Sequence, residues 1–471
     1  MNGIPKGRHS GASKAECRPF LSSTERDVIR LVHEPGFDRW LDQIKATGGC
    51  ENPVYLAGYT TVQRAETGEI LRHYSTENEP GGRMPVRCRN RRERRCAPCS
   101  YLHAGDTYQI VRAGLSGGKG VHDSVQHHPR VLVTLTAPGF GPVHRATDSA
   151  EVCRPRRNGG LCPHGLPVGC PHRHPADSSA PGRPLCPACY DYVGHVLWHA
   201  LAGRLWARFC DGLKRCLASM AGIPRSRLGE QLRLSFAKVA EYQKRGAVHF
   251  HAVIRADGPD GPNAAPPPWI DTDFLENAVH SSAATGYVQA PFSSATGERK
   301  IVWGEQIDVH PIRGEHFTGE IVTPDAVAAY ISKYITKSVS DAGGLDQRVH
   351  TYEEIAYAPV NPHIRALMAT CWRLGALPEF ESLRLRPWAH TLGYRGHALT
   401  KSRRYSTTYG ELRDVRARYA SESIGASDTL TDAAWRYVGS GHTPGEEEIA
   451  RAVSHELRVA RESYRERVTD E

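Results

Sequence analysis

Alternating apolar and polar residues predict several strands along this chain. Residues 130–138 alternate and are rich in β-branched side chains, so they predict a strand that ends at a proline. Residues 232–255 predict two strands joined as a hairpin, and shorter strands are expected at 300–303 and 306–312. Residues 257–268 are rich in glycine, proline and alanine and predict a loop.

Other segments follow a helical period. The longest covers residues 190–221. Thr323-Pro324-Asp325 combines an N-cap residue, a proline at the first helical position and an acid in the first turn, so it predicts a helix over 324–338. Weaker helical signals occur around 24–44, and most of the chain after about residue 345 is expected to be helical. Strands and helices together predict an α+β fold.

Two histidines stand on one face of the second hairpin strand. Side chains alternate between the faces of a strand, so His249, His251 and Val253 point one way, and Phe250 and Ala252 point the other. Two imidazoles side by side on one face favour a metal site. The alternative is a pair of surface histidines with an ordinary Glu–His hydrogen bond.

The hairpin loop determines whether a carboxylate joins them. Residues 244–246 end in glycine and predict a three-residue loop with that glycine in the left-handed region. Pairing Gln243 with Ala247 then places Glu241 opposite His249. This mixed nitrogen and oxygen set suits Mg²⁺ or Mn²⁺ shared with a phosphate. With a two-residue loop, Glu241 would face away.

The helix predicted at 324–338 carries two phenols and two ammonium groups. Tyr330, Lys333, Tyr334 and Lys337 fall within an arc of about 100° on a helix of 3.6 residues per turn. Tyrosines four residues apart can reach the same point, and lysines can stabilise a phenolate or the charge that develops on phosphorus. The alternative is an amphipathic helix with packing tyrosines.

Charge and length narrow the class of protein. The 471 residues include 60 Lys and Arg against 51 Asp and Glu, a net charge of +9 that suits a nucleic-acid partner, although a GC-rich genome also enriches arginine. This length predicts two or three domains. No run approaches ~18 uncharged apolar residues, which argues against a membrane-spanning helix. No signal peptide is visible after Met1, so a cytoplasmic location is expected.

Clustered cysteines in a reducing compartment indicate zinc. Cys96-x-x-Cys99 and Cys186-x-x-Cys189 each form half of a four-ligand structural site, and they could pair with each other or belong to two local sites. The predicted zinc ligands are Cys88, Cys96, Cys99, Cys162, Cys170, Cys186 and Cys189, with Cys153, His164, His172 and His174 as further possibilities. The isolated cysteines, which are expected to pack, are Cys17, Cys50, Cys210, Cys216 and Cys371.

A basic segment near residue 400 mixes cations, hydroxyls and phenols. Lys401, Arg403, Arg404 and Tyr405 are candidates for contacts with DNA, because cations bind phosphates and phenols stack on bases. A solvated loop is the alternative.

Three motifs in this order resemble the HUH endonuclease superfamily. They are Val133-Thr134-Leu135-Thr136, His249-Phe250-His251, and the two-tyrosine run at 330–337. Longer runs at 186–192, 238–243 and 396–406 resemble, more narrowly, the replication initiators of actinomycete rolling-circle plasmids and integrative conjugative elements. The resemblance covers about residues 85–415.

The resemblance implies a five-stranded antiparallel sheet with the histidines on a central strand and the tyrosine helix facing them. It also implies that one tyrosine attacks a phosphodiester at a replication origin, forms a 5′-phosphotyrosyl link and releases a 3′-OH for rolling-circle replication. Related single-tyrosine initiators have Lys-Tyr-x-x-Lys around the nucleophile, so Tyr334 is expected to attack first and Tyr330 second. The implied partners are origin DNA, single-stranded at the nick, with a host helicase and polymerase.

These observations divide the chain into four expected parts. They are a helical region at 1–80, a basic cysteine-rich segment at 81–125, an HUH endonuclease domain at 126–345 with a zinc-binding insertion at 150–190, and a mostly helical region at 346–471 that carries the basic DNA-contacting segment. Two other functions stay open. One is a relaxase or transposase of the same superfamily, although no nucleotide-binding P-loop occurs. The other is a non-enzymatic, zinc-dependent DNA-binding regulator.

Overall fold

The structure, a computed structural model, forms two compact units. It describes residues 21–147, 151–154, 160–313, 323–422 and 429–469. Of these, the smaller unit contains 21–88, 95–98 and 429–469, and the larger contains 89–94 and the described residues from 99 to 422. Within these ranges, none of the helices combines the length and apolar character needed to cross a membrane.

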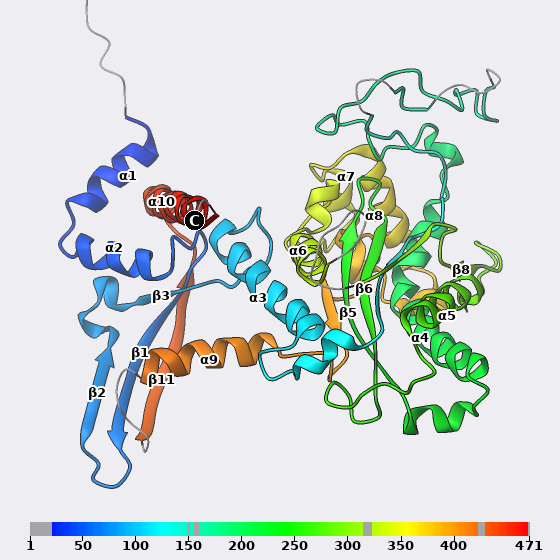
Figure 1. The fold of residues 1–471 in the computed structure, drawn as a ribbon. Helices are drawn as coiled ribbons and strands as arrows, with labels where there is room; N and C mark the ends of the chain where they lie inside the picture. Colours follow the sequence, from blue (N-terminus) through cyan, green and yellow to red (C-terminus); the bar gives the residue numbers. More distant parts are fainter. Residues whose placement is uncertain (1–20, 148–150, 155–159, 314–322, 423–428, 470–471) are drawn as a thin grey trace, which may run out of the picture. The chain divides into compact units, whose positions relative to one another are not determined.

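The smaller unit is an antiparallel sheet with three helices. The strand order is β11 (Thr429–Ser440), β1 (Val54–Arg64) and β2 (Ile70–Ser75), and β3 (Met84–Val86) also pairs with β1. Helix α10 (Pro444–Thr469) contacts both α1 (Ser23–Val32) and α2 (Phe37–Ala46). The two ends of the described chain therefore build one unit (Figure 1, blue and orange to red).

This pairing differs from the expected division of the chain. The region expected to be helical at 1–80 also contains β1 and β2, and the region expected to be mostly helical at 346–471 contributes β11 to the same sheet. The boundaries expected at residues 80 and 346 do not coincide with the two units. Strand β11 pairs with a strand more than 350 positions earlier, a partner that local periodicity cannot reveal.

The larger unit contains a five-stranded antiparallel sheet. Its strand order is β10 (Leu399–Lys401), β5 (Arg233–Tyr242), β6 (Val248–Asp257), β4 (Arg130–Leu135) and β9 (Ile307–Pro311). The α+β class with antiparallel sheets is confirmed. The strand expected at 300–303 is β8 (Lys300–Val302), which pairs with β7 (Tyr287–Gln289) in a separate two-stranded sheet.

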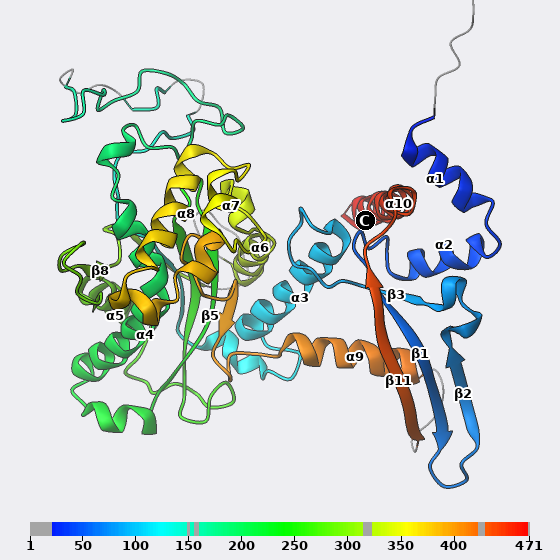
Figure 2. The same cartoon turned by 180° about the vertical axis from the view of Figure 1, so that it is seen from behind.

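Helices cover both faces of the five-stranded sheet (Figures 1 and 2). On one face, Phe250 of β6 is buried in a core with Trp198 of α4 (Tyr192–Met220) and Leu275 of α5 (Thr272–Thr285). Helix α8 (Pro362–Leu374) packs against α4, and α7 (Tyr352–Ala356) packs against α8. On the other face, Val253 is buried with Ile331 of α6 (Pro324–Ile335) and residues of α3 (Ala97–Ser116). The alternation of side chains along β6 thus divides the core into two layers.

A buried ion pair lies at the end of β6. Arg255 and Asp257 are fully buried, and the two guanidinium nitrogens Nε and Nη2 donate to Asp257 over 2.6 and 2.9 Å. Ser235 and His128 complete the set of partners of this carboxylate, at 2.6 and 2.8 Å. Burial works against ionisation of Asp257, but the hydrogen bonds from His128 and Arg255 outweigh it, so the pKa of the carboxyl lies below its usual value.

Tyr405 belongs to this core rather than to the surface. It is fully buried, and its hydroxyl donates to the carbonyl of Val111 on α3 over 3.0 Å. The expectation that its ring stacks on a DNA base is therefore wrong for this structure, because helix α3 covers the ring. Helix α9 (Tyr409–Glu422) begins four residues later.

Gly114 on α3 makes this close packing possible, and its substitution is expected to destabilise the fold. A Cβ atom at Gly114 would lie 2.3 Å from the Tyr405 ring, so Gly114→Ala should lower the free energy of unfolding by about 1–3 kcal/mol. Gly105→Ala on the same helix is the matched control, because nothing lies within 4 Å of its added Cβ. That variant should be neutral or gain up to about 1 kcal/mol from helix propensity. Urea unfolding followed by circular dichroism measures both, and a Gly114→Ala protein as stable as the control would contradict the packing.

Candidate functional site

The β5–β6 hairpin sets the register of the site. The Gln243 N–H donates to the carbonyl of Ala247 over 2.8 Å, and Gly246 closes the loop with φ +78°. This is the predicted three-residue loop, and Glu241 pairs with His249 across the two strands. Glu241, His249 and His251 consequently share one face of the sheet.

Glu241 connects the strand to the residues that follow the tyrosine helix. One carboxylate oxygen accepts from His251 Nε2 over 2.9 Å, and the other accepts from Lys337 Nζ over 2.9 Å. Burial works against ionisation of Glu241, but these two hydrogen bonds and the positive charge of Lys337 outweigh it, so its pKa lies below the usual value. Although Glu241 pairs with His249 in the backbone register, its carboxylate contacts the diagonal neighbour His251.

His251 is the most enclosed of the three residues. It is 3% exposed, and its Nδ1 lies 3.1 Å from the Thr134 hydroxyl and 3.4 Å from the Tyr330 hydroxyl. Because the carboxylate of Glu241 can only accept, His251 donates from Nε2, and in the neutral ring Nδ1 accepts from these hydroxyls. The orientation of the imidazole is therefore fixed from both sides.

His249 has a buried nitrogen without a hydrogen-bond partner. Its Nε2 atom is enclosed and unsatisfied. Burial, followed by the electrostatic effect of the neighbouring His251, lowers the pKa of His249 to about 4, so the His249 ring is neutral near pH 7. A neutral imidazole with a free nitrogen suits coordination of a metal ion.

Both tyrosines of α6 lie against His251. The Tyr334 ring stacks on the imidazole at a centroid distance of 5.0 Å, and the Tyr330 ring meets it edge-on at 5.1 Å. The two phenol rings are 4.8 Å apart. Burial, and then the contact with Tyr334, raises the pKa of Tyr330 above its usual value. Helix α6 starts as predicted, with the Thr323 hydroxyl accepting from Ala326 N–H and Pro324 in the first turn.

The two lysines of the motif have different surroundings. Lys337 follows the last turn of α6, and its Nζ lies 4.4 Å from the centre of the Tyr334 ring as well as on Glu241. Lys333 is exposed. The structure therefore brings Lys337 to the site and leaves Lys333 on the surface of the helix.

A cavity of about 490 Å³ opens beside these residues. Glu241, His249, His251 and Tyr330 line it, and Tyr334 is not among its lining residues. Three polar residues that the sequence analysis missed also line it, namely Asp308 and His310 of β9 and Gln306, which directly precedes this strand. Thr134 of β4 pairs with both His251 and Asp308, so all three occupy one row across the sheet. The residues of β9 reach the cavity only because β9 pairs with β4 in the sheet. No local sequence motif predicts that pairing.

The chemistry of Glu241, His249 and His251 suits Mg²⁺ or Mn²⁺, but their present spacing does not yet form a metal site. His249 offers a free nitrogen, and Glu241 supplies an oxygen, the ligand type that Mg²⁺ and Mn²⁺ prefer. Among the described residues, the groups whose ligand atoms all lie within 4.8 Å of one another are three cysteine-containing groups, and Glu241, His249 and His251 are not one of them. An ion held by all three would replace the hydrogen bond between His251 and Glu241.

Two of the cysteine-containing groups lie in the segment between β4 and α4. In the first, the four ligand atoms of His144, Cys153, Cys170 and His174 lie within 4.8 Å of one another. His174 Nε2 is 3.4 Å from the Cys170 sulfur and 3.1 Å from His144 Nδ1. His144 was missed in the sequence, because it stands before the expected insertion. His172 belongs to none of the three groups that the described residues form.

The second group consists of Cys162, His164, Cys186 and Cys189. His164 Nδ1 lies 3.2 Å from the Cys189 sulfur and 3.7 Å from the Cys186 sulfur. Cysteine and histidine at such distances could bind zinc. Cys186 and Cys189 thus share a group with Cys162 and His164 of the same segment, and not with Cys96 and Cys99. Cys170 belongs to the other group of this segment.

The third group is formed by Cys50, Cys88, Cys96 and Cys99. The expectation that Cys50 merely packs is wrong, since its sulfur lies 3.8 Å from the Cys96 sulfur and accepts from the Cys88 N–H over 3.3 Å. The other cysteines expected to pack, Cys210, Cys216 and Cys371, lie outside these groups, and Cys17 lies outside the described residues.

The basic segment near residue 400 divides into exposed and enclosed residues. Arg403 and Arg404 are exposed, as a contact with DNA requires. Lys401 is half-buried, and its Nζ donates to the Ser406 carbonyl over 2.8 Å. Tyr405 is in the core, as described above.

Comparison with known proteins assigns the chain to a class. The family model described as "Replication initiator protein, pSAM2" (RepSA) matches residues 36–455. A replication initiator protein of Streptomyces ambofaciens is 43% identical over 462 residues, which cover 95% of this chain and 96% of that protein. No solved structure matches the chain significantly. The chain is therefore a replication initiator. It belongs to the RepSA family, whose model covers the whole of the larger unit and most of the smaller one.

Proposed function

We propose that this initiator nicks one strand of a replication origin through a tyrosine nucleophile of the HUH type. The observation that carries the proposal is the meeting of the histidine strand β6 and the tyrosine helix α6 beside one cavity, with both phenols against His251. Family membership favours initiation of replication over conjugative transfer or transposition. A regulator that only binds DNA would have no use for the contacts between the histidine motif and the tyrosine motif. These contacts therefore argue for a chemical role.

The reaction exchanges one phosphate ester for another. A phenolic oxygen attacks the scissile phosphorus, a tyrosine–phosphorus ester forms, and the bond to the 3′ oxygen breaks. The phenol loses its proton, and the released 3′ oxygen gains one. The energy of the phosphodiester stays in the new ester, so the strand can be rejoined. The free 3′-OH then primes synthesis by a host polymerase, with a host helicase opening the duplex.

His249, His251 and Glu241 would hold a Mg²⁺ or Mn²⁺ ion. When bound, the ion polarises the scissile phosphate as a Lewis acid and orients it. Lys337 remains beside the Tyr334 ring at 4.4 Å, where its charge stabilises a phenolate. Thr134 keeps the His251 ring in place from Nδ1.

Tyr334 and Tyr330 differ in the charge near the ring and in their position relative to the cavity. Tyr334 has the cation of Lys337 next to its ring, which favours Tyr334 as the first nucleophile. Tyr330 lines the cavity and lacks that cation, so it is placed to make a second attack after one round of synthesis. This order agrees with the choice of Tyr334 from the Lys-Tyr-x-x-Lys spacing.

The three cysteine-containing groups would each hold one structural Zn²⁺ ion. Two of them lie in a segment whose described residues form isolated β-bridges and one short 3-10 helix rather than strands or long helices. Four cysteine and histidine ligands with no open position are typical of structural rather than catalytic zinc.

A covalent product is the first expected outcome. The protein should nick a supercoiled plasmid that carries its own origin and stay attached to the 5′ end after denaturation. Mapping of the DNA-linked peptide by mass spectrometry should find the adduct on Tyr334. Nicked DNA with free 5′ ends would sink the covalent mechanism, and an adduct on Tyr330 would reverse the order of attack.

Removing single hydroxyls separates the two tyrosines. Tyr334→Phe should reduce initial nicking by on the order of a thousandfold, because the ring stays and only the nucleophile is lost. Tyr330→Phe should keep nicking and impair release of closed single-stranded circles. Tyr357→Phe is the matched control, since that ring is 87% exposed and outside the cavity. Nicking by Tyr334→Phe at the rate of this control would exclude Tyr334.

The histidines should act in cleavage rather than in duplex binding. His249→Ala should reduce Mn²⁺-dependent nicking by on the order of a hundredfold or more and leave duplex affinity nearly unchanged, because phosphate contacts elsewhere supply most of it. Direct titration of Mn²⁺, followed by its electron paramagnetic resonance signal, should show weaker binding to this variant. His280→Ala removes an exposed histidine on α5 and serves as the control. Equal loss of binding and cleavage in His249→Ala would indicate a structural role instead.

Metal analysis tests the zinc groups. The purified protein should contain about three zinc ions per chain, one for each four-ligand group. Cys50→Ser should reduce the content by one ion, whereas Cys216→Ser, a half-buried cysteine of α4 outside the groups, should leave it unchanged. Full zinc content in Cys50→Ser would remove Cys50 from the ligand set.

A further inference from the structure

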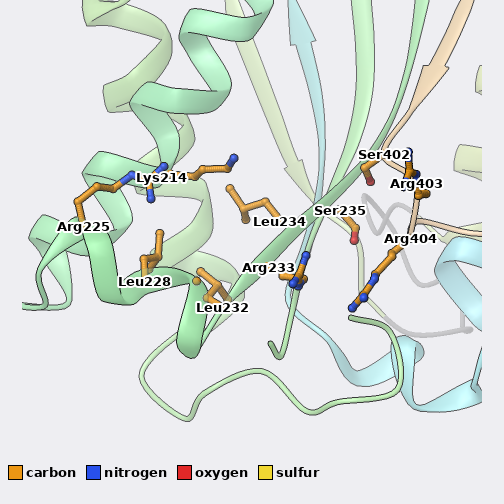
Figure 3. A pocket seen from close by; sticks show the side chains of 11 residues that line it. Lys214, Arg225, Leu228, Leu232, Arg233, Leu234, Ser235, Ser402, Arg403 and Arg404 are labelled. Atoms are coloured by element: carbon orange, nitrogen blue, oxygen red, sulfur yellow. The ribbon is translucent and has the colours of Figure 1, made fainter. Parts of the chain in front are cut away.

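A second cavity, of about 600 Å³, lies at the other end of strand β5 (Figure 3). Its lining residues come from α4, from the turn before β5, from β5 itself and from the segment after β10. Eight residue steps along β5 separate Arg233, which lines this cavity, from Glu241 at the active site. At about 3.3 Å per residue, the two sites are roughly 26 Å apart along the strand.

The lining of this cavity is strongly basic. It contains five cationic side chains and no carboxylate among the described residues that line it; the cations are Lys214, Arg225, Arg233, Arg403 and Arg404. The hydrogen bonds that orient two of them go to neutral acceptors. Arg404 donates to the Asp260 carbonyl over 2.9 Å, and Arg233 donates to the Pro259 carbonyl. Their positive charges are therefore available to a ligand.

The residues that neighbour the cations are buried or held by hydrogen bonds. Leu228 and Leu232, in the floor of the cavity, are 2% and 3% exposed. Ser402 is held in both directions, because its N–H donates to the Phe236 carbonyl and its hydroxyl accepts from the Phe236 N–H, each over 2.9 Å. Ser235 is tied to the buried Asp257 at 2.6 Å. Arg403 and Arg404 thus project from a fixed segment, which reduces the conformational entropy lost on binding.

We propose that this cavity binds the phosphodiester backbone of the DNA duplex that flanks the nick site. Four exposed arginines and the half-buried Lys214, beside polar and apolar lining residues, suit phosphates, which arginine binds with paired N–H donors. Because one strand carries a phosphate about every 3.4 Å, roughly 26 Å places this contact about eight nucleotides from the scissile phosphate. The spacing of about eight nucleotides rests on the proposed nicking function, whereas the proposed binding of duplex DNA by the cavity does not. Contacts of this type position the protein without reading sequence.

The salt dependence of DNA binding tests the proposal. The full-length protein is titrated with a fluorescent duplex of about 30 base pairs and arbitrary sequence, and the slope of log Kd against log salt is measured. Lys214→Gln/Arg225→Gln and Arg403→Gln/Arg404→Gln should each reduce the slope by close to two, about 0.9 for each lost phosphate contact. Arg403→Lys/Arg404→Lys keeps both charges and should retain most of the slope.

Arg227→Gln is the matched control on the same turn. Arg227 is exposed, is paired with Glu230 at 3.2 Å and does not line the cavity, so its loss should leave the slope unchanged. A wild-type slope in both double variants would overturn the proposal. So would loss of binding to inorganic phosphate or to an acidic peptide without any effect on the duplex, because the occupant would then not be DNA.

A second substrate locates the contact relative to the nick. Adding about 12 base pairs of flanking duplex to a short single-stranded nick site should tighten binding by the wild-type protein and steepen its salt dependence. The double variants should lose that gain. Failure of the wild-type protein to cut the short strand would contradict the proposed nicking, but it would leave the duplex titration as an independent test of the cavity.

Discussion

The register of the β5–β6 hairpin is the constraint on which the rest of the site depends. A shift of one residue between the two strands would place Glu241 on the opposite face from His249 and His251, toward α4 and α5. The three-residue loop that ends at Gly246 fixes the register at one end. At the other end, the buried pair of Arg255 and Asp257 would lose its partners if the strands slipped. The apolar residues of β6 oppose slippage as well, since they fill a packed core.

The same strands contribute residues to both of the proposed functional surfaces of the larger unit. Near the hairpin loop, β5 and β6 carry the polar residues that face α6, and at the start of β5 the chain opens into the basic cavity. Between them, Val239 and Val253 pack under α6 and α3. The apolar middle thus fixes the separation between the proposed nicking site and the proposed site of contact with the DNA backbone. Such a spacing would allow an initiator to hold a duplex while one strand reacts.

The three cysteine-containing groups suggest how irregular segments of this chain are stabilised. The described residues between 143 and 191 form short bridges, such as Arg154 with Cys170, instead of extended strands. Such a segment buries little apolar surface, and metal coordination would replace that missing source of stability. Cys50 and His144 belong to these groups although they lie outside the Cys-x-x-Cys pairs and the expected zinc-binding insertion.

Much of the geometry of the candidate site follows from the sequence alone, because it depends on neighbours within a few positions. Loop length and a glycine at position 246 determine which residue faces His249, and Thr323 with Pro324 determines where α6 begins. The resemblance to known initiators supplied the five-stranded antiparallel sheet, which spacing alone does not determine.

The remaining features were decided by tertiary structure, because they join residues that are distant in the chain. Strand β11 completes the sheet of the N-terminal region, Asp308 enters the cavity from β9, and Cys50 reaches Cys96. Tyr405 has the composition of a DNA contact but lies under α3, since Gly114 leaves room for its ring. Local pattern determines what a side chain can do, and the path of the chain determines which partners it meets.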